Sequence, residues 1–373
     1  MHEPDIGCNS YHTHDKLLVL LRAGLHTLPE EDITNMRFGE TDWPQLYRLA
    51  VKHGILAIIW DGLQQYVTQR RITTTEEPDR NLKLQWAYNI KQIEDKYQRQ
   101  LSIANDLSDR LFREAEVRMV IFKGLPLSSC YPVPQHRECG DIDCWMSGGF
   151  ADGNRWIENR GIRVNYENPK HATFTYKGVS IENHDTFFDT KTHRIDRILE
   201  CAMHNFIEKE GYSQDSRTGL QTLSPTAHAL FLLRHTSRHL PTGIALRHLT
   251  DWALFIKKHG HEINWKALIG ILKQCNLMTF WNALNGMIYD SGLVDRSLLP
   301  AFQRIPDIEQ RLLNHILEPP AFDTDSRILI KRIRNKILRR HNQKWIYCDV
   351  LHEVYLLRIW QSFIAHIRKP DSI

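Results

Sequence analysis

Apolar residues recur at helical spacing towards both ends of the chain, with a different pattern between them. From Trp43 to Trp60 they stand three or four positions apart, which is typical of helices that bury one face. The stretch 81–112 mixes polar and apolar residues as a long pair of helices would. After Ser224-Pro225, a suitable N-cap and first helical residue, we expect further helices over 227–239, 245–259, 265–275, 280–291, 326–345 and 349–368.

The middle of the chain has the pattern of strands and turns. The run from Arg118 to Phe122 is mostly apolar and ends at Lys123-Gly124, which predicts a short buried strand followed by a tight turn. Leu125 to Cys130 is apolar enough for a short helix, and Gly140 opens a second predicted strand over 141–146.

Two further runs, 171–177 and 179–184, flank Gly178 and predict a β-hairpin. Together these patterns indicate an α+β fold with a small mixed β-sheet. We expect an N-terminal helical region over residues 1–110, a core that contains the sheet over 111–195, and a C-terminal helical region over 196–373.

The composition of the 373-residue chain is that of an ordinary globular protein, with 42% hydrophobic and 25% charged residues. The net charge of +4 is too mild to indicate an obligate nucleic-acid binder. No apolar run approaches the roughly 18 residues of a membrane span, and the first residues lack the pattern of a signal peptide. The seven cysteines are scattered without Cys-x-x-Cys, so we expect a reducing, cytoplasmic location without a disulfide framework or a structural zinc site.

Three acidic residues are the candidate catalytic and metal-binding groups. Asp141 and Asp143 are one residue apart on a predicted strand and should share a face. Two like charges this close repel each other unless a cation lies between them. Carboxylate oxygens suit Mg²⁺, which binds one or two carboxylates together with substrate phosphates. Glu182 could join the pair from a neighbouring strand, and three carboxylates could hold two metal ions about 3.5–4 Å apart.

Four neighbouring residues are candidates for nucleotide binding. Gly124 would stand at the N-terminus of a short helix, where phosphate is favoured. Lys123 could pair with triphosphate oxygens or be an ordinary turn lysine. Arg137 could fork onto phosphate or brace the two aspartates. His184 falls on the same face of the hairpin as Glu182, where it could orient an acceptor, orient a carboxylate or have only a structural role.

These residues resemble the motifs of the uncharacterised nucleotidyltransferase family within the DNA polymerase β-like superfamily. Its members typically have a Lys-Gly pair, then Arg-x-x-x-Asp-hydrophobic-Asp, then an acidic-x-His strand. The matching stretches here are Phe122-Lys123-Gly124, Arg137-x-x-Gly140-Asp141-Ile142-Asp143 and Ile181-Glu182-Asn183-His184. Asp42-Trp43 with the helical stretch after it, and Leu233 to Asp251, extend the resemblance over roughly residues 40 to 260.

The resemblance implies a nucleotidyltransferase core over 111–195 that moves a nucleoside monophosphate from a nucleoside triphosphate to an acceptor hydroxyl. Mg²⁺ or Mn²⁺ would be the cofactor, held by Asp141, Asp143 and Glu182, although Glu182 could instead be the general base. The acceptor could be a small molecule, a protein or RNA. Two other functions use the same residues: an antitoxin-like binding module with weakened catalysis, and a metal-dependent phosphohydrolase.

Two further features allow more than one interpretation. His235 and His239 lie one helical turn apart and could bind zinc if Asp251 joined them, but we expect a role in helix packing. The segment 327–344 contains eight Lys or Arg and no acid. We expect it to be a solvated face of a packed helix, and the alternative is contact with RNA, a triphosphate-bearing acceptor or an anionic surface.

Overall fold

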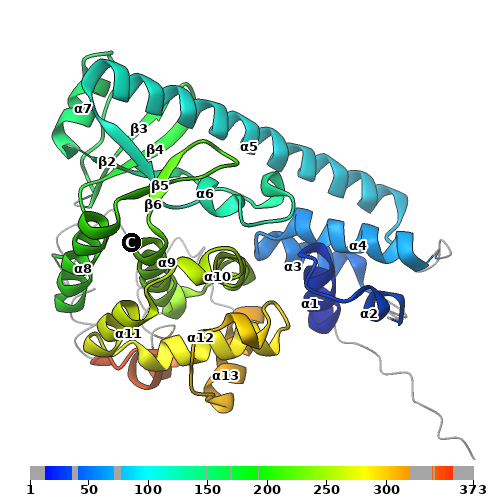
Figure 1. Cartoon of the computed structure of the whole chain (residues 1–373). Coiled ribbons are helices and arrows are strands. Elements are labelled where there is room, and N and C mark those ends of the chain that lie inside the picture. The colour runs from blue at the N-terminus through cyan, green and yellow to red at the C-terminus, as the bar shows by residue number, and fades with distance from the viewer. Residues whose placement is uncertain are drawn as a thin grey trace, which may run out of the picture.

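Helices surround one small β-sheet, so the predicted α+β class is confirmed (Figure 1). The structure is a computed structural model, and the residues that it describes are 13–35, 41–70, 77–147, 149–168, 170–191, 193–318, 338 and 341–355. None of the helices in these ranges combines the length and the apolarity that crossing a membrane requires.

Ahead of Arg80, the described residues of the N-terminal region form short and medium-length helices. They are α1 (Thr13–Gly24), α2 (Glu30–Asn35), α3 (Trp43–Lys52) and α4 (Leu56–Arg70). Where α1 crosses α4, a Cβ atom on Gly24 would stand 2.0 Å from the carbonyl oxygen of Ile58, and one on Gly62 would stand 2.0 Å from that of Leu20. The two backbones therefore touch more closely than any side chain would allow.

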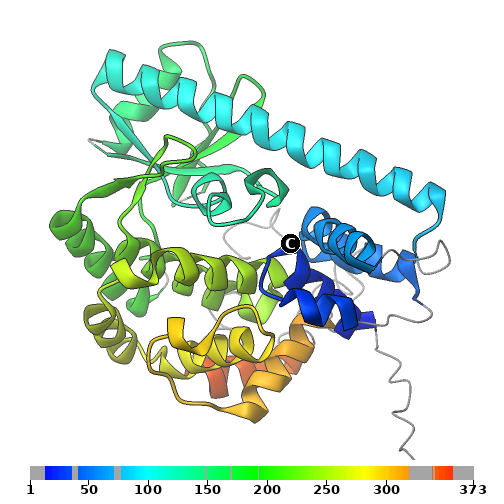
Figure 2. The same ribbon diagram turned by 45° about the vertical axis from the view of Figure 1, so that its right-hand side comes forward.

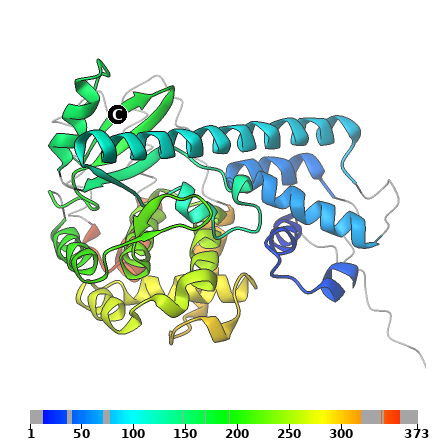
Figure 3. The same cartoon turned by 45° about the horizontal axis from the view of Figure 1, so that its top comes forward.

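Helix α5 (Arg80–Ala115) links this region to the sheet. We predicted a pair of helices here, which is wrong: the 36 residues form one continuous helix of roughly 54 Å. The stretch contains neither Gly nor Pro, so nothing in it breaks the helix. Trp86 belongs to the core shared with the N-terminal helices and Leu107 to the core under the sheet, and Figures 2 and 3 show the helix running from one region to the other.

The sheet has four strands in the order β1-β2-β4-β3. Their bounds are β1 Arg118–Ile121, β2 Ile142–Ser147, β3 His171–Tyr176 and β4 Val179–His184. Strands β1 and β2 are antiparallel, β2 and β4 are parallel, and β3 and β4 form the antiparallel hairpin that we predicted. The sheet is therefore mixed, as the sequence predicted.

The two faces of the sheet have different neighbours. Helices α5 and α7 (Phe150–Glu158) cover one face, where Ile142, Ile181 and Trp156 are buried in a common core. The opposite face contacts the C-terminal helices, because Phe122 packs edge-on against Phe231 of α9 with the ring centroids 4.7 Å apart.

Asp143 of β2 and Glu182 and His184 of β4 point to this second face and line a cavity with residues of α8 and α9. Asn183 of β4 points to the first face, where it donates to Asn154 of α7 at 3.0 Å.

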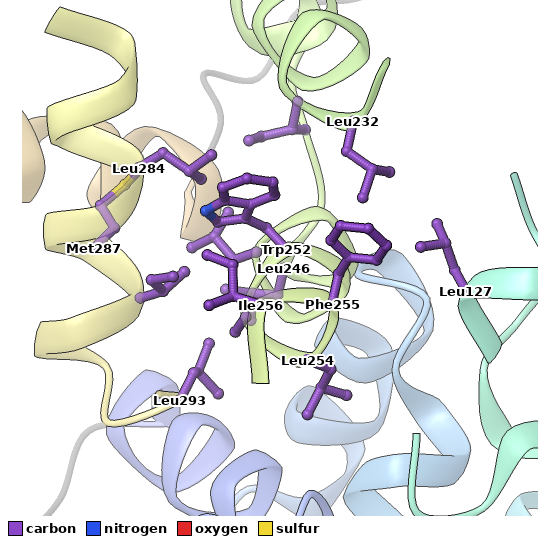
Figure 4. Close-up of a cluster of buried hydrophobic side chains, with 14 of the residues drawn as sticks. Leu127, Leu232, Leu246, Trp252, Leu254, Phe255, Ile256, Leu284, Met287 and Leu293 are labelled. Atoms are coloured by element: carbon purple, nitrogen blue, oxygen red, sulfur yellow. The ribbon is translucent and has the colours of Figure 1, made fainter. Parts of the chain in front are cut away.

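The C-terminal region is helical throughout its described part, apart from a short hairpin. The helices are α8 (Arg194–Glu210), α9 (Pro225–His239), α10 (Leu246–His259), α11 (Trp265–Gln274), α12 (Met278–Asp290) and α13 (Pro306–Leu317), and the hairpin is β5 (Tyr212–Gln214) with β6 (Gln221–Leu223). As predicted, Ser224 caps α9 and accepts from the Ala227 N–H at 3.5 Å. Their core gathers around Trp252, and Leu127 of the short helix α6 (Leu125–Ser128) approaches this cluster next to Phe255 (Figure 4).

Some elements were not predicted and some predictions lie outside the described residues. Helices α7, α8 and α13 and the β5–β6 hairpin were not expected as individual elements. Most of 326–345 and of 349–368 lies outside the described residues, and so does most of the basic segment 327–344. The short turns within the described part are η2 Pro134–His136, η3 Leu240–Thr242, η4 Gly260–Glu262, η5 Arg296–Leu298 and the π-helical η6 Ile346–Val350.

The loop that leads into β2 is fixed to the N-terminal helices by His136. Its Nδ1 lies 2.6 Å from Asp61 Oδ2 of α4, and its Nε2 lies 3.1 Å from Glu94 Oε1 of α5. Because both partners are carboxylates, both ring nitrogens must carry protons to donate. Burial opposes this charge, but the bonds to Asp61 and Glu94 outweigh burial and raise the pKa of His136 above its ordinary value.

We predict that His136→Gln destabilises the protein most below about pH 6.5, by an amount on the order of 1 kcal/mol. A raised folded-state pKa contributes stability that is complete below the unfolded pKa and is lost as the pH rises through the folded one. The free energy of unfolding, measured by denaturant titration at several pH values, should therefore differ less between the two proteins at high pH. A difference that stays constant or widens with pH would contradict this role.

Candidate active site

The parallel pairing of β2 with β4 sets Asp143 directly beside Glu182. Paired residues on neighbouring strands point to the same face, at a strand spacing of about 4.8 Å. Both carboxylates lie close to the same atom, His184 Nε2, at 3.2 Å for Asp143 Oδ1 and 3.6 Å for Glu182 Oε2. The structure therefore brings together two of the three predicted acids, and it does so through a strand pairing that the sequence analysis anticipated.

Asp143 is a buried, ionised carboxylate with two cationic neighbours. The ammonium of Lys123 lies 3.1 Å from its Oδ2, and the ring of His184 lies 3.2 Å from its Oδ1. Burial works against the charge of Asp143, yet the hydrogen bond with His184 and the nearby charge of Lys123 hold its pKa well below the ordinary value. Lys123 is about one-third exposed and can therefore also reach a ligand in front of the strand.

His184 stands between the two acids. Its ring packs edge-on against Phe122, with the ring centroids 5.1 Å apart. Burial favours the neutral ring, but the contacts with Asp143 and Glu182 raise the pKa of His184 above its ordinary value. The same contact with His184 is the main reason why the pKa of Glu182 is lowered. His184 is thus hydrogen-bonded to Asp143 and forms an ion pair with Glu182, so these three residues form one electrostatically coupled group.

His171 completes the group and was not among the predicted site residues. It is paired with His184 across the hairpin, and its Nδ1 lies 3.6 Å from Glu182 Oε2. Burial lowers the pKa of His171, although the charge of Glu182 acts in the opposite direction. The hairpin itself contained the signal: a two-residue turn at Lys177-Gly178 sets the register and places residue 171 opposite residue 184.

Asp141 and Gly124 lie just outside this group. Strand β2 begins at Ile142, so Asp141 belongs to the preceding turn, where strand alternation does not fix its direction, and its side chain is exposed. Gly124 has φ +71° and precedes α6, a conformation that favours glycine. Because α6 has only four residues, the attraction of phosphate to its N-terminus depends on a few N–H groups rather than on a long helix.

The guanidinium of Arg137 forms a bidentate pair with Asp251, a partner that we did not predict for it. Its Nε and Nη2 each donate to one oxygen of Asp251 in α10 at 2.7 Å, and the side chains of both residues are at least nine-tenths buried. Asp251 also accepts from the Tyr131 hydroxyl at 2.7 Å. Arg137 therefore ties the loop before β2 to the C-terminal helices, and its guanidinium does not contact either predicted aspartate.

A cavity of about 460 Å³ opens in front of the acidic group. It lies between the sheet and helices α8 and α9, and its charged lining consists of the acids Asp143, Glu182, Asp189 and Asp196 with the cations Lys123, Lys170, Arg234 and Arg238. Arg234 is almost fully buried and donates through Nε to Asp196 at 2.5 Å, whereas its Nη2 has no hydrogen-bond partner among the described residues. The two carboxylates thus face cationic side chains, of which Arg234 and Arg238 are paired with acids of the same cavity.

The comparison with family models gave a match that covers most of the chain. The model of an uncharacterised nucleotidyltransferase family covers residues 39–286, which is more than half of the chain. The chain belongs to this family. The matched range includes the whole sheet, the acidic group and helices α9 and α10. Neither the comparison with curated proteins nor the comparison with solved structures gave a match.

Helices α9 and α10 line a second cavity of about 260 Å³, which adjoins the first. Lys123, His235 and His239 line both cavities, and the two imidazoles lie 4.6 Å apart between ring centroids. Burial lowers the pKa of His239 to about 4, so its ring is neutral at ordinary pH. The zinc alternative for this pair is not supported, because its third ligand, Asp251, is taken up by Arg137 and Tyr131.

Because Arg137 and Asp251 form a buried ion pair, we predict that their contributions to the free energy of unfolding are strongly coupled. Removing one partner of a buried ion pair leaves the other charge unpaired and costs about 3–5 kcal/mol. We therefore expect Arg137→Met and Asp251→Leu each to destabilise the protein strongly, and the double variant to lose less than the sum. Free energies of unfolding from denaturant titration measure the coupling.

The exposed pair Arg113–Asp109 within α5 is the matched control, because ion pairs at the surface couple weakly. For the control pair we expect the losses in the free energy of unfolding to add. If the losses for Arg137 and Asp251 also add, Arg137 does not hold this loop against α10.

Proposed function

We propose that this protein is a metal-dependent nucleotidyltransferase that transfers a nucleoside monophosphate from a nucleoside triphosphate to an acceptor hydroxyl and releases pyrophosphate. The observation that carries the proposal is the pairing of Asp143 with Glu182 beside Lys123, at the wall of a cavity that also contains cationic side chains. The chain's family membership supports the same reaction class.

The cationic side chains are suited to a triphosphate. Lys123 follows directly after Phe122, which continues the β1 backbone by donating to the Asp143 carbonyl at 3.4 Å. Its ammonium is therefore held at the sheet edge but remains partly exposed. Arg234, which is paired with Asp196, also lines this cavity and keeps one buried N–H group, at Nη2, without a partner among the described residues. In the proposed complex, these two residues neutralise the phosphate charge that grows as pyrophosphate departs.

The acids fit a divalent cation. Carboxylate oxygens are the donors that Mg²⁺ prefers and Mn²⁺ also accepts, and Asp143, Glu182 and Asp141 would hold the ion. Lys123 and His184 already balance negative charge at Asp143, which indicates that the position favours a cation. When bound, the ion would supply positive charge that stabilises the phosphate oxygens and favours the ionised form of the acceptor hydroxyl.

The reaction itself then requires in-line positioning and one proton acceptor. The acceptor oxygen forms a bond to the α-phosphorus while the bond from that phosphorus to the β-phosphate oxygen breaks. The hydroxyl proton passes to a carboxylate, and we assign this role to Oε1 of Glu182, because Oε2 is the oxygen near His171 and His184. His184 is a positioning residue that keeps Asp143 and Glu182 oriented towards the cavity.

The proposal is tested by incubating the purified full chain with α-labelled and, separately, γ-labelled ATP, GTP, CTP and UTP, with Mg²⁺ or Mn²⁺ and a cell extract. Transfer of the α-label to an acceptor fraction together with release of pyrophosphate supports it. Release of orthophosphate or free nucleotide without a labelled acceptor would indicate a phosphohydrolase, and nucleotide binding without turnover would indicate a binding module. Either of these outcomes overturns the proposal.

Asp143→Asn and Asp141→Asn should each reduce the rate of transfer by at least about a thousandfold. The reason is that the ion held by these acids would stabilise the charged transition state by several kcal/mol. Asp152→Asn is the control, since Asp152 is an exposed acid of α7 that contacts Arg155. Initial rates of label transfer under saturating metal measure the effect. A variant of Asp143 with the wild-type rate would remove Asp143 from the site.

Lys123→Ala should weaken nucleotide binding by about tenfold or more, the typical loss for one charge-assisted hydrogen bond. Lys177→Ala is a close control, because Lys177 also precedes a glycine with positive φ in a turn but lies at the far end of the hairpin. Calorimetric titration with a non-hydrolysable nucleoside triphosphate measures both variants. Equal dissociation constants for the two would make Lys123 an ordinary turn lysine.

A further inference from the structure

Two imidazoles and one carboxylate converge on the hairpin β3–β4, beside the acids already described. Among the described residues, His171, Glu182 and His184 form the group whose potential ligand atoms all lie within 4.8 Å of one another. We propose that these three side chains form a binding site for a divalent transition-metal ion, of the class of Zn²⁺ and Co²⁺. The proposal is carried by the geometry of the hairpin. It shares Glu182 and His184 with the proposed active site, so an ion bound here would replace the hydrogen bond between His184 and Asp143.

The register of the hairpin builds this group. Tyr176 pairs with Val179 around the Lys177-Gly178 turn, and the ladder continues until His171 lies opposite His184. Glu182 is two residues from His184 on the same strand, so its side chain points to the same face. Three ligands on two adjacent antiparallel strands therefore face one point, and the strand pairing holds them there without any loop.

The polar atoms of the two rings point to the same centre. His171 Nδ1 and His184 Nε2 each lie 3.6 Å from Glu182 Oε2, which is slightly beyond hydrogen-bond distance. His171 Nδ1 is buried and has no hydrogen-bond partner in the described part of the chain. A buried polar atom without a partner is unfavourable, and a metal ion between these three atoms would supply one.

The chemistry of the ligands decides which ions this site selects. Mg²⁺ takes oxygen ligands and keeps several waters, whereas imidazole nitrogen favours zinc and its neighbours among the transition metals. Two histidines and one glutamate are also a ligand set that Zn²⁺ uses when it keeps a position open for water or substrate. Asp143 Oδ1 lies 3.2 Å from His184 Nε2, so a further carboxylate stands next to this position.

The test uses the full chain after removal of metal with a chelator. Titration with Zn²⁺ in a calorimeter, in the presence of a large excess of Mg²⁺, should give one site per chain. Titration with Co²⁺ should give the visible absorption bands of a nitrogen-ligated ion. His171→Gln should weaken Zn²⁺ binding by at least about tenfold, and Zn²⁺ should raise the melting temperature of the wild type but not of this variant.

Two control variants make the result specific. His204→Gln removes the imidazole of a simple His–Glu contact, between His204 and Glu200 at 3.2 Å, and Cys201→Ser removes an exposed thiol that could bind Zn²⁺ by itself. Both should bind Zn²⁺ as the wild type does. Circular dichroism first establishes that His171→Gln is folded. Unchanged Zn²⁺ affinity in this variant, loss of binding in Cys201→Ser, or displacement of Zn²⁺ by an equal concentration of Mg²⁺ would each overturn the proposal.

Discussion

The parallel pairing of β2 with β4 is the constraint on which the site depends. It places Asp143 beside Glu182, and the hairpin that continues from β4 then adds His171 opposite His184. Parallel neighbours require a crossover connection, which this chain makes through α7 and β3. A shift of one residue between β2 and β4 would turn one carboxylate into the core under α5, so the core residues Ile142 and Ile181 hold the acids in place.

Two buried ion pairs position the elements around the larger cavity, one between the sheet and α10 and one between α8 and α9. Arg137 reaches Asp251 of α10 from the loop before β2, whereas Arg234 of α9 reaches Asp196 of α8 at the far wall of the larger cavity. The cations opposite the acids are thus positioned by elements more than 40 residues away in sequence. The sheet thus presents acids to a cavity in which two of the four lining cations, Arg234 and Arg238, come from helix α9.

Local patterns predicted the elements around the site, but not the long-range pairs. The run before Gly124, the hairpin around Gly178 and the capped start of α9 follow from neighbouring residues, and all three are observed. Asp141 shows the limit of strand alternation, because the strand begins one residue after it. The partners of Arg137 and Arg234 depend on how helices far apart in sequence pack together, which periodicity does not encode.

The central claim is that Asp143 and Glu182 bind one cation in contact with the triphosphate of a bound nucleotide. The most direct measurement is a crystal structure of the full chain with Mn²⁺ and a non-hydrolysable nucleoside triphosphate, with the ion located by its anomalous scattering. We predict an Mn²⁺ ion coordinated by both carboxylates, with phosphate oxygens beside Lys123. An ion and nucleotide bound elsewhere, for example in the cavity of about 300 Å³ beside Asp215 and Lys258, would contradict it.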